Sequence, residues 1–120
     1  MAESTAPTPL SHAILLALAG EDRHGYGIIK AVDLQSEGAL RPGTGTLYTA
    51  LQRLLDEGLI AESSREPAPE EDRRRKYYRL TEAGREAART ETLRLARLVA
   101  LARDRALVDA PELARTLAGR

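Results

Sequence analysis

This 120-residue chain contains no cysteine, no tryptophan and no phenylalanine, so its four tyrosines are its only large aromatic side chains. The absence of cysteine excludes disulfides, thiol nucleophiles and cysteine-ligated zinc. The scarcity of aromatic residues leaves Leu, Ile, Val and Ala to form the core. Such a composition favours packed helices over a β-sandwich or barrel, which are rich in aromatic and β-branched residues.

Long hydrophobic runs are also missing. The longest one, residues 13–19, is too short to cross a bilayer, and the residues before it lack the basic cluster of a secretory signal. We therefore expect a cytoplasmic protein that makes no membrane contact. The two histidines, His12 and His24, fall in different predicted helices, and neither belongs to a nucleophile or metal-binding motif. The sequence predicts neither an enzyme nor a metal or other cofactor.

Net charge is absent as well, because 18 basic and 18 acidic side chains balance. Their distribution along the chain is uneven, however. Residues 61–72 carry five acids and one Arg, residues 73–80 carry five basic residues and no acid, and residues 81–106 carry six Arg against four acids. A concentrated basic patch in a neutral protein indicates a local binding surface more specifically than an overall positive charge would.

Two short helices are predicted in the first third of the chain. Residues 1–9 have the composition of a disordered lead-in. Ser11 is a suitable N-cap for the first helix, which carries apolar residues at helical spacing and ends at Gly20. A polar turn at 21–23 follows, and the second helix is predicted to begin near His24.

A third helix is predicted from Thr44, its N-cap, to about Glu57, with Gly58 in the left-handed conformation that ends many helices. On a helical wheel the apolar face consists of Leu47, Ala50, Leu51, Leu54 and Leu55. The opposite face consists of Gly45, Thr49, Gln52 and Asp56, and its flanks are Thr46, Tyr48 and Arg53. An ordinary solvent face is rich in Lys, Arg and Glu, whereas this one is nearly uncharged for three turns. That pattern makes it the strongest candidate for a binding surface.

The segments 59–65 and 76–80 have the pattern of two short strands, joined by a charged loop at 66–75. They form a hairpin with a long tip, which must pack on the helices because two strands alone are not a stable sheet. Tyr77 and Tyr78 alternate across the second strand, so one of them is expected to pack inward. We interpret both as mainly structural.

Thr81 is the predicted N-cap of a long helix that has Glu82 in its first turn and extends to about Arg105 or beyond. Apolar and small residues recur along it in alternating steps of four and three, the spacing of a coiled-coil seam. The apolar stripe is wider than one small domain can cover, so we infer a second copy of the chain. A final short segment, of one or two helical turns, begins at Pro111. The residues expected at the dimer contact are Leu95, Leu98, Val99, Ala102 and Ala106.

Three helices, a hairpin and a long helix, in this order, predict a winged helix-turn-helix with a dimerisation arm. The fold class is mainly α with a small β-hairpin wing. The predicted organisation is a disordered N-terminal lead-in at 1–9, a winged helix-turn-helix DNA-binding domain at 10–80, and a C-terminal helical dimerisation arm at 81–120.

Two segments resemble PadR-type transcriptional regulators. The first begins Thr46-Leu47-Tyr48, ends Glu57-Gly58-Leu59-Ile60, and is similar to the third helix and first wing strand of that family. The second, Lys76-Tyr77-Tyr78-Arg79-Leu80-Thr81-Glu82-Ala83-Gly84, is similar to its second wing strand and the start of its C-terminal helix. The first helices match more loosely through Ile14-Leu15 and His24-Gly25-Tyr26, and the resemblance covers roughly residues 9–108.

The resemblance implies a homodimeric winged-helix protein that binds double-stranded DNA, usually a repressor with an inverted-repeat operator. It resembles the short-armed members of the family. Some members bind flat aromatic drugs between Trp residues, and this chain has no Trp with which to do so. A cavity between the long helices and the winged domains could admit another small-molecule effector, whose identity the sequence does not name.

Within the third helix, Thr46, Thr49 and Gln52 are suited to base edges in a major groove, because Gln pairs with adenine and Thr offers a hydroxyl and a methyl group. Tyr48 and Arg53 are better placed for phosphates. The basic run after the acidic loop is expected to meet the DNA backbone or an adjacent minor groove. The predicted DNA-binding residues are Tyr26, Thr44, Thr46, Tyr48, Thr49, Gln52, Arg53, Arg73, Arg74, Arg75 and Lys76.

The alternative is a winged-helix module that binds proteins and not DNA, because a fold does not fix a function. The zero net charge favours this alternative slightly, as do the acids Glu70, Glu71 and Asp72 directly before the basic run. Those acids could pair with the neighbouring cations in a solvated loop. Salt dependence separates the two hypotheses, since only a DNA-binding protein has DNA affinity to lose as ionic strength rises.

Overall fold

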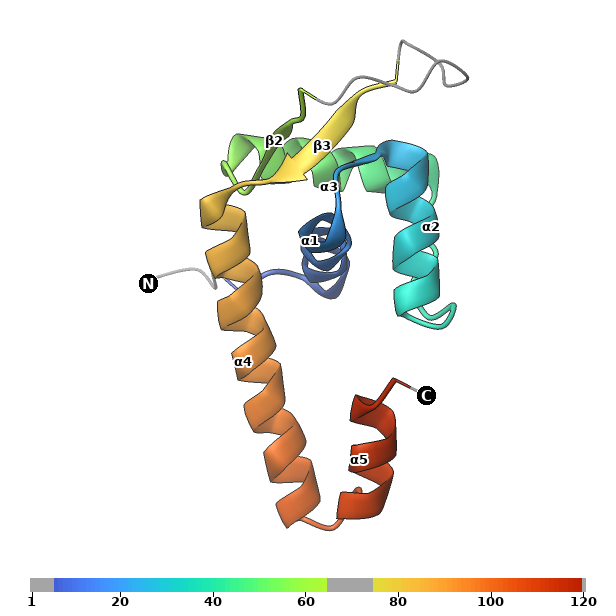
Figure 1. Cartoon of the computed structure of the whole chain (residues 1–120), viewed down its shortest axis with the longest axis vertical. Coiled ribbons are helices and arrows are strands. Elements are labelled where there is room, and N and C mark those ends of the chain that lie inside the picture. Colours follow the sequence, from blue (N-terminus) through green and yellow to red (C-terminus); the bar gives the residue numbers. More distant parts are fainter. Residues whose placement is uncertain (1–5, 65–74, 120) are drawn as a thin grey trace. The chain divides into compact units, whose positions relative to one another are not determined.

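The computed structural model describes residues 6–64 and 75–119, which form five helices and three strands (Figure 1). Residues 1–5 of the expected lead-in and most of the predicted wing tip, with Arg73 and Arg74, lie outside the described residues. The chain divides into two compact units, 1–89 and 90–120, which are described in turn. In chain order the elements are α1 (Pro9–Gly20), β1 (Arg23–His24), α2 (Gly25–Gln35), α3 (Thr44–Asp56), β2 (Ile60–Glu62), β3 (Tyr77–Leu80), α4 (Glu82–Asp104) and α5 (Ala110–Leu117).

The core of the first unit lies between α1, α2 and α3 and beneath the sheet. Its helices contribute aliphatic side chains at helical spacing, as the composition requires, and Ala13 and Ala88 fill the narrower places. The predicted apolar face of α3 is confirmed, because its three central leucines are fully buried and Ala50 and Leu55 pack at the margin. The largest fully buried side chains are Ile14, Leu15, Ile28, Val32, Leu47, Leu51, Leu54 and Ile60.

Two predicted helix starts are corrected. Thr8, not Ser11, caps α1, since the Thr8 hydroxyl accepts a hydrogen bond of 3.1 Å from the Ser11 amide. Pro9 follows directly and is well suited to a first helical position, so the helix begins upstream of the apolar periodicity. Thr44 is likewise the first residue of α3, and its N-cap is Gly43, which has no side chain to make a capping hydrogen bond.

The end of α3 agrees with the prediction. Gly58 adopts a φ of 74°, and its amide donates to the Leu55 carbonyl at 3.0 Å. The Leu59 amide donates to the Leu54 carbonyl, also at 3.0 Å, which completes a Schellman motif. This turn directs the chain from α3 straight into β2.

The sheet has three antiparallel strands in the order β1-β3-β2, not the two of the predicted hairpin. The prediction of a polar turn at 21–23 is wrong for Arg23, which belongs to β1. In this strand Arg23 pairs with Tyr78, and His24 pairs with Tyr77. On the other side of β3, Ile60 pairs with Leu80. Both hairpin strands are shorter than predicted. A two-residue strand has no periodicity of its own, so only its pairing with β3 defines β1.

Tyr77 and Tyr78 are both buried, although one inward-facing ring was predicted. Tyr78 joins the helical core. Tyr77, on the opposite face of the strand, packs edge-to-face against the His24 ring, with centroids 5.2 Å apart. The extra strand and the start of α2 supply cover that a bare hairpin would lack, so neither ring faces solvent.

Thr81 caps α4 as predicted and also anchors it to the wing. Its hydroxyl accepts from the Gly84 amide at 3.0 Å and donates to the Gly58 carbonyl at 2.7 Å. The Thr81 amide donates to the Leu59 carbonyl at 3.2 Å. The first turn of α4 is therefore tied to the turn that follows α3.

The second unit contains most of α4, with α5. Near the start of this unit, Arg94 makes a bidentate contact with the buried carboxylate of Glu91, from Nε to Oε1 at 2.8 Å and from Nη2 to Oε2 at 2.7 Å. These hydrogen bonds raise the pKa of Arg94. α4 ends at Asp104, and Ala106 has a φ of 60°, so the predicted seam does not continue in helical form to Ala106. Asp109 and Glu112 form a capping box that starts α5.

No helix within the described residues is long and apolar enough to cross a membrane.

Two glycines in and after α3 give a matched test of this fold. A Cβ atom on either Gly45 or Gly58 would meet no other atom within 4 Å, so only backbone conformation separates them. Gly58→Ala should lower the free energy of unfolding by about 1 kcal/mol, because it forces an L-residue into the left-handed region. Gly45→Ala should raise it by up to about 1 kcal/mol, because alanine is the better helix former. Urea unfolding followed by circular dichroism measures both, and equal effects would contradict the assigned backbone geometry.

Candidate nucleic-acid interface

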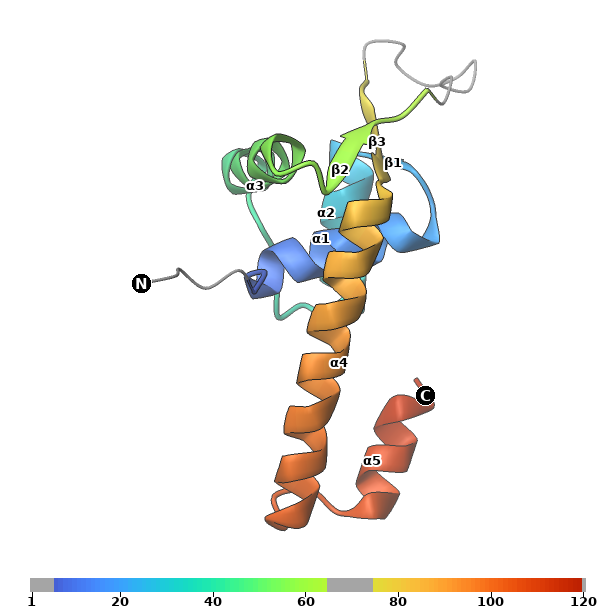
Figure 2. The same ribbon diagram turned by 90° about the vertical axis from the view of Figure 1, so that its left-hand side faces the viewer.

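The outer face of α3 is exposed along its whole length, as predicted. All of the side chains predicted to contact DNA from this helix are accessible, and Asp56 at its end is exposed too. Figure 2 looks nearly along this helix. The leucines of α3 pack into the core, so the polar side of the helix faces away from it. The exposed predicted residues are Thr44, Thr46, Tyr48, Thr49, Gln52 and Arg53.

The two acids at the end of α3 each contact a residue that was predicted to bind DNA. Gln52 Nε2 donates to Asp56 Oδ1 at 2.9 Å, and Arg53 Nε lies 3.7 Å from Glu57 Oε2. The four-residue spacing between the partners within one helix predicts both pairs. Exposed pairs of this kind contribute little stability, so Gln52 and Arg53 can exchange them for other partners.

Tyr48 of α3 packs against the start of α2, where Tyr26 is also exposed. A Cβ atom on the buried Gly25 would lie 2.7 Å from Tyr48 Cζ, so glycine is needed there for the ring to pack. Tyr48 keeps 46% of its surface exposed and Tyr26 keeps 58%. Lys30 Nζ lies 5.4 Å from the centre of the Tyr26 ring, a cation–π contact. Lys30 was not predicted, although it follows Tyr26 by one helical turn.

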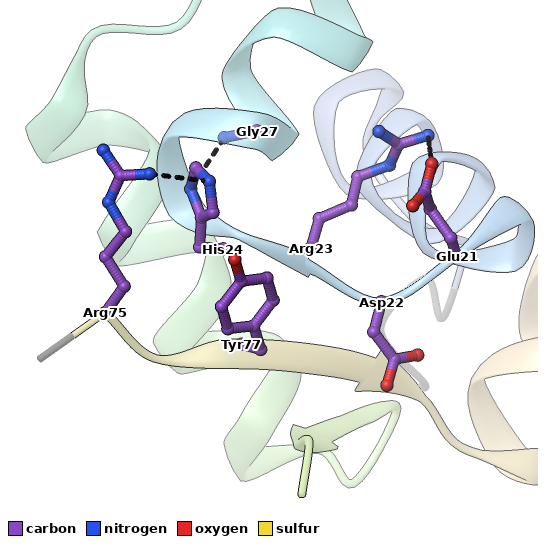
Figure 3. A pocket seen from close by; sticks show the side chains of 7 residues that line it. All are labelled: Glu21, Asp22, Arg23, His24, Gly27, Arg75 and Tyr77. Carbon is purple, nitrogen blue, oxygen red and sulfur yellow. Dashed lines mark hydrogen bonds and ion pairs between the residues drawn. The ribbon is translucent and has the colours of Figure 1, made fainter. Parts of the chain in front are cut away.

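The base of the wing meets the start of α2 around His24, next to a pocket of about 310 Å³ (Figure 3). The Gly27 amide donates to His24 Nδ1 at 3.1 Å, which makes His24 the side-chain N-cap of α2. Arg75 Nη1 lies 3.0 Å from His24 Nε2. A neutral imidazole has one acceptor nitrogen, so these two donors compete for it. The structure thus brings Arg75, from the predicted basic run, to the same residue that starts α2.

Acidic side chains share this pocket, which the sequence did not reveal. Figure 3 shows Glu21 beside Arg23, and the Arg23 Nη2 to Glu21 Oε1 distance is 3.6 Å. Arg23 also donates through Nε to the Ala17 carbonyl at 2.9 Å, and Asp22 accepts a short hydrogen bond from the Ser63 hydroxyl. The Arg23 side chain is therefore held by contacts within the protein. Arg75 and Lys76 are exposed, and so is Arg79 within β3.

The first turns of the helices differ in charge along the chain. α1, α2 and α3 have no acidic residue in the first turn. α4 and α5, by contrast, have Glu82 and Glu112 there. A helix N-terminus carries a partial positive charge, which an acid in the first turn offsets. The helices of the candidate interface keep that positive end uncompensated by their own side chains.

Burial raises the pKa of the Tyr78 phenol above its ordinary value near 10, and the neighbouring Tyr48 and Glu62 raise it further. Tyr78 pairs directly with Glu62 across the sheet.

A third helix with an exposed polar face, held above a three-stranded wing, defines a winged helix-turn-helix, a fold that presents one helix to DNA. Helices, sheet and wing base all belong to the first unit. The chain belongs to the Transcriptional regulator PadR-like family, which matches it over residues 14–90.

Relatives of known structure or function agree with this class. The transcriptional regulator YqjI of Escherichia coli K12 is 35% identical over 71 residues, which are 59% of this chain and 31% of that protein. This chain therefore spans about a third of that relative. A PadR family transcription regulator from Clostridium difficile R20291 is 26% identical with a TM-score of 0.67, over 84% of this chain and 100% of that one. Bacillus subtilis PadR, solved in complex with operator DNA, shares the fold at 24% identity and a TM-score of 0.57, over 69% of this chain and 46% of that one.

The buried phenol predicts a loss of stability in alkali. Because the pKa of Tyr78 is higher in the folded state, its contribution is complete below the unfolded pKa and is lost as pH rises through the folded pKa. The free energy of unfolding should therefore fall as pH rises above about 10, the ordinary pKa of a tyrosine. Tyr78→Phe should reduce this fall, whereas Tyr26→Phe, at an exposed ring, should leave it unchanged. Denaturant unfolding at several pH values measures both, and equal slopes for the two variants would contradict the prediction.

Proposed function

We propose that this chain is a sequence-specific transcriptional repressor that binds double-stranded DNA as a homodimer on an inverted-repeat operator. The observation that carries the proposal is the exposed and nearly uncharged outer face of α3 in a PadR-like chain. A protein-interaction surface would be expected to expose apolar anchors at its centre, and this face presents hydroxyls and an amide. The operator complex of the B. subtilis relative gives the precedent for this use of the fold.

In the proposed complex, α3 enters the major groove with Thr46, Thr49 and Gln52 at base edges. Gly45 lets the helix approach closely, and its neighbour Thr44 lies at the helix end that favours phosphate. The remaining contacts are to phosphates, from Tyr26, Tyr48, Arg53, Arg75 and Lys76, with Arg73 and Arg74 in the same basic run.

The homodimer is proposed from the apolar side chains of α4. Leu95, Leu98, Val99 and Ala102 fall on one face of the helix, and the first three are exposed by 37% to 49%. Exposed leucines in this density are unusual for a solvated helix and are typical of one that pairs with another copy. Ala106 lies beyond the helix, so its place in the contact would depend on the turn that follows.

The proposal includes a cytoplasmic location and no catalytic activity, with release from the operator by a small-molecule effector. Such an effector would act by favouring dimers whose two α3 helices do not match the half-site spacing, about one turn of DNA. Two copies on an inverted repeat make binding sensitive to that spacing.

Variants at the base and phosphate positions test the DNA contacts. Gln52→Ala should weaken operator binding by about 1–3 kcal/mol and change the base preference at one position. Arg75→Gln should weaken binding to all duplexes alike and reduce the salt slope by about one. Fluorescence anisotropy with operator and scrambled duplexes at two salt concentrations measures these effects. Arg103→Gln, at an exposed arginine of the second unit, is the matched control. Wild-type affinity in both test variants would contradict the assignment.

A charge on the proposed dimer face tests the oligomeric state. Leu95→Glu should convert a species of twice the 13.1 kDa chain mass into a monomer, because it buries an unpaired carboxylate in the contact. Leu93→Glu places the same charge on the opposite side of α4, at a residue of similar exposure, and should leave the dimer intact. Light scattering after size-exclusion chromatography reports the mass. A monomeric wild type, or two variants that behave alike, would contradict the proposed face.

A further inference from the structure

A groove of about 490 Å³ lies between the start of α1 and the flank of α3 that points away from Tyr48. The DNA contacts proposed above use residues of its α3 wall only, and its α1 wall has no role in them. Its walls combine hydroxyl groups with one cation, and most of its lining surface is apolar. The residues that matter here are Thr8, Leu10 and Ser11 on one wall and Thr46, Thr49 and Arg53 on the other.

Ser11 gives the first indication of a ligand. The residue is 7% exposed, and its hydroxyl has no hydrogen-bond partner among the described residues, although its amide is bonded to Thr8. Every side-chain nitrogen or oxygen that is sealed from solvent in the described part of the chain has a partner. The Ser11 hydroxyl is therefore reachable from solvent, and Ser11 lines both this groove and a smaller adjoining hollow that also contains Glu57. A group bound in the groove can accept a hydrogen bond from this hydroxyl.

Charge at the groove favours an anion. The Arg53 side chain is 67% exposed, and its 3.7 Å contact with Glu57 is long enough to be given up. The α1 terminus adds a partial positive charge, with no acid in its first turn. The Thr8 hydroxyl, which accepts from the Ser11 amide, still has a hydrogen to donate. Two hydroxyl donors and one guanidinium thus surround the same space.

The shape of the major groove identifies the anion. An α-helix with its side chains is about 10–12 Å wide and fills a major groove about 12 Å wide, so phosphates line both of its flanks. The Tyr48 flank of α3 adjoins α2, whose start faces one strand in a helix-turn-helix complex. The Thr46 and Arg53 flank then faces the other strand, and the groove lies along it.

We infer that the groove between α1 and α3 seats a phosphodiester of that second strand, held by the hydroxyls of Thr8 and Ser11 and by the guanidinium of Arg53. This inference rests on the proposed function, and it makes α1 a part of the DNA surface. The phosphate would replace Glu57 as the partner of Arg53 and would give the Ser11 hydroxyl its missing acceptor. Phosphate contacts on both flanks of α3 would fix the rotation of this helix in the major groove of DNA.

Neutral phosphate analogues locate the contact. An operator is first selected from random duplexes by the wild-type protein, and single methylphosphonates are then placed at each position of a half-site. The wild-type protein should bind more weakly when the methylphosphonate lies in either strand that borders the major groove. Ser11→Ala should weaken binding to the unmodified operator roughly threefold to tenfold and Arg53→Gln roughly tenfold or more. Both variants should become insensitive to the methylphosphonate at the same single position on one strand.

The controls separate this contact from general damage. Both substitutions suit a helix, so circular dichroism and melting temperature should stay at wild-type values. Thr116→Ala removes a hydroxyl that bonds within α5, and Arg103→Gln removes an exposed cation of the second unit, so both should keep wild-type binding and sensitivity. Operator binding by wild type together with unchanged methylphosphonate profiles in Ser11→Ala and Arg53→Gln would overturn this inference alone. Failure of wild type to select any operator would overturn the proposed function with it.

Discussion

Three leucines on the inner face of α3, Leu47, Leu51 and Leu54, pack into the core formed by the first two helices and the sheet, and this contact determines what α3 can present outward. Each buried leucine contributes about 1.5–3 kcal/mol. Rolling α3 far enough to expose all three would cost about as much as the whole stability of a small domain. The helix is therefore held at one rotation about its axis, and a fixed set of hydroxyl and amide groups faces solvent. A surface that reads another molecule by direct contact needs this kind of rigidity.

β3 connects that helix to the wing and to α2. It is the central strand, so its two tyrosines are covered on both faces, one by the helical core and one by the His24 ring. His24 also caps α2 and lies within reach of Arg75. The His24 imidazole thus contacts both the base of the wing and the start of α2, and a neutral imidazole has one acceptor nitrogen for these two donors.

Local patterns in the sequence were sufficient for the apolar face of α3, its glycine-terminated end, the Thr81 cap and the order of the helices, because each of these depends on residues within a few positions of one another. The missed strand and the second buried tyrosine depend on contacts between distant residues. β1 exists only because Arg23 and His24 pair with β3, and the second buried tyrosine follows from that extra strand. At α1, Thr8 and Pro9 outweighed the equally suitable Ser11. The exposed face of α3 was predictable from its wheel, whereas the acids that hold Gln52 and Arg53 required attention to spacing within the same helix.

The uncompensated starts of α1, α2 and α3 have a consequence for how a neutral chain approaches a polyanion. With 18 charges of each sign, the molecule has no monopole to draw it toward DNA from a distance. Its attraction comes from separated charges and helix ends, whose field decays faster with distance and is screened beyond about 8–10 Å at physiological salt. Encounters would therefore be governed by diffusion until the surfaces nearly touch, and only then would the field turn the protein into register. For the proposed DNA-bound state, this would confine the non-specific attraction to one face of the protein and shorten the time that the protein spends on unrelated sequence.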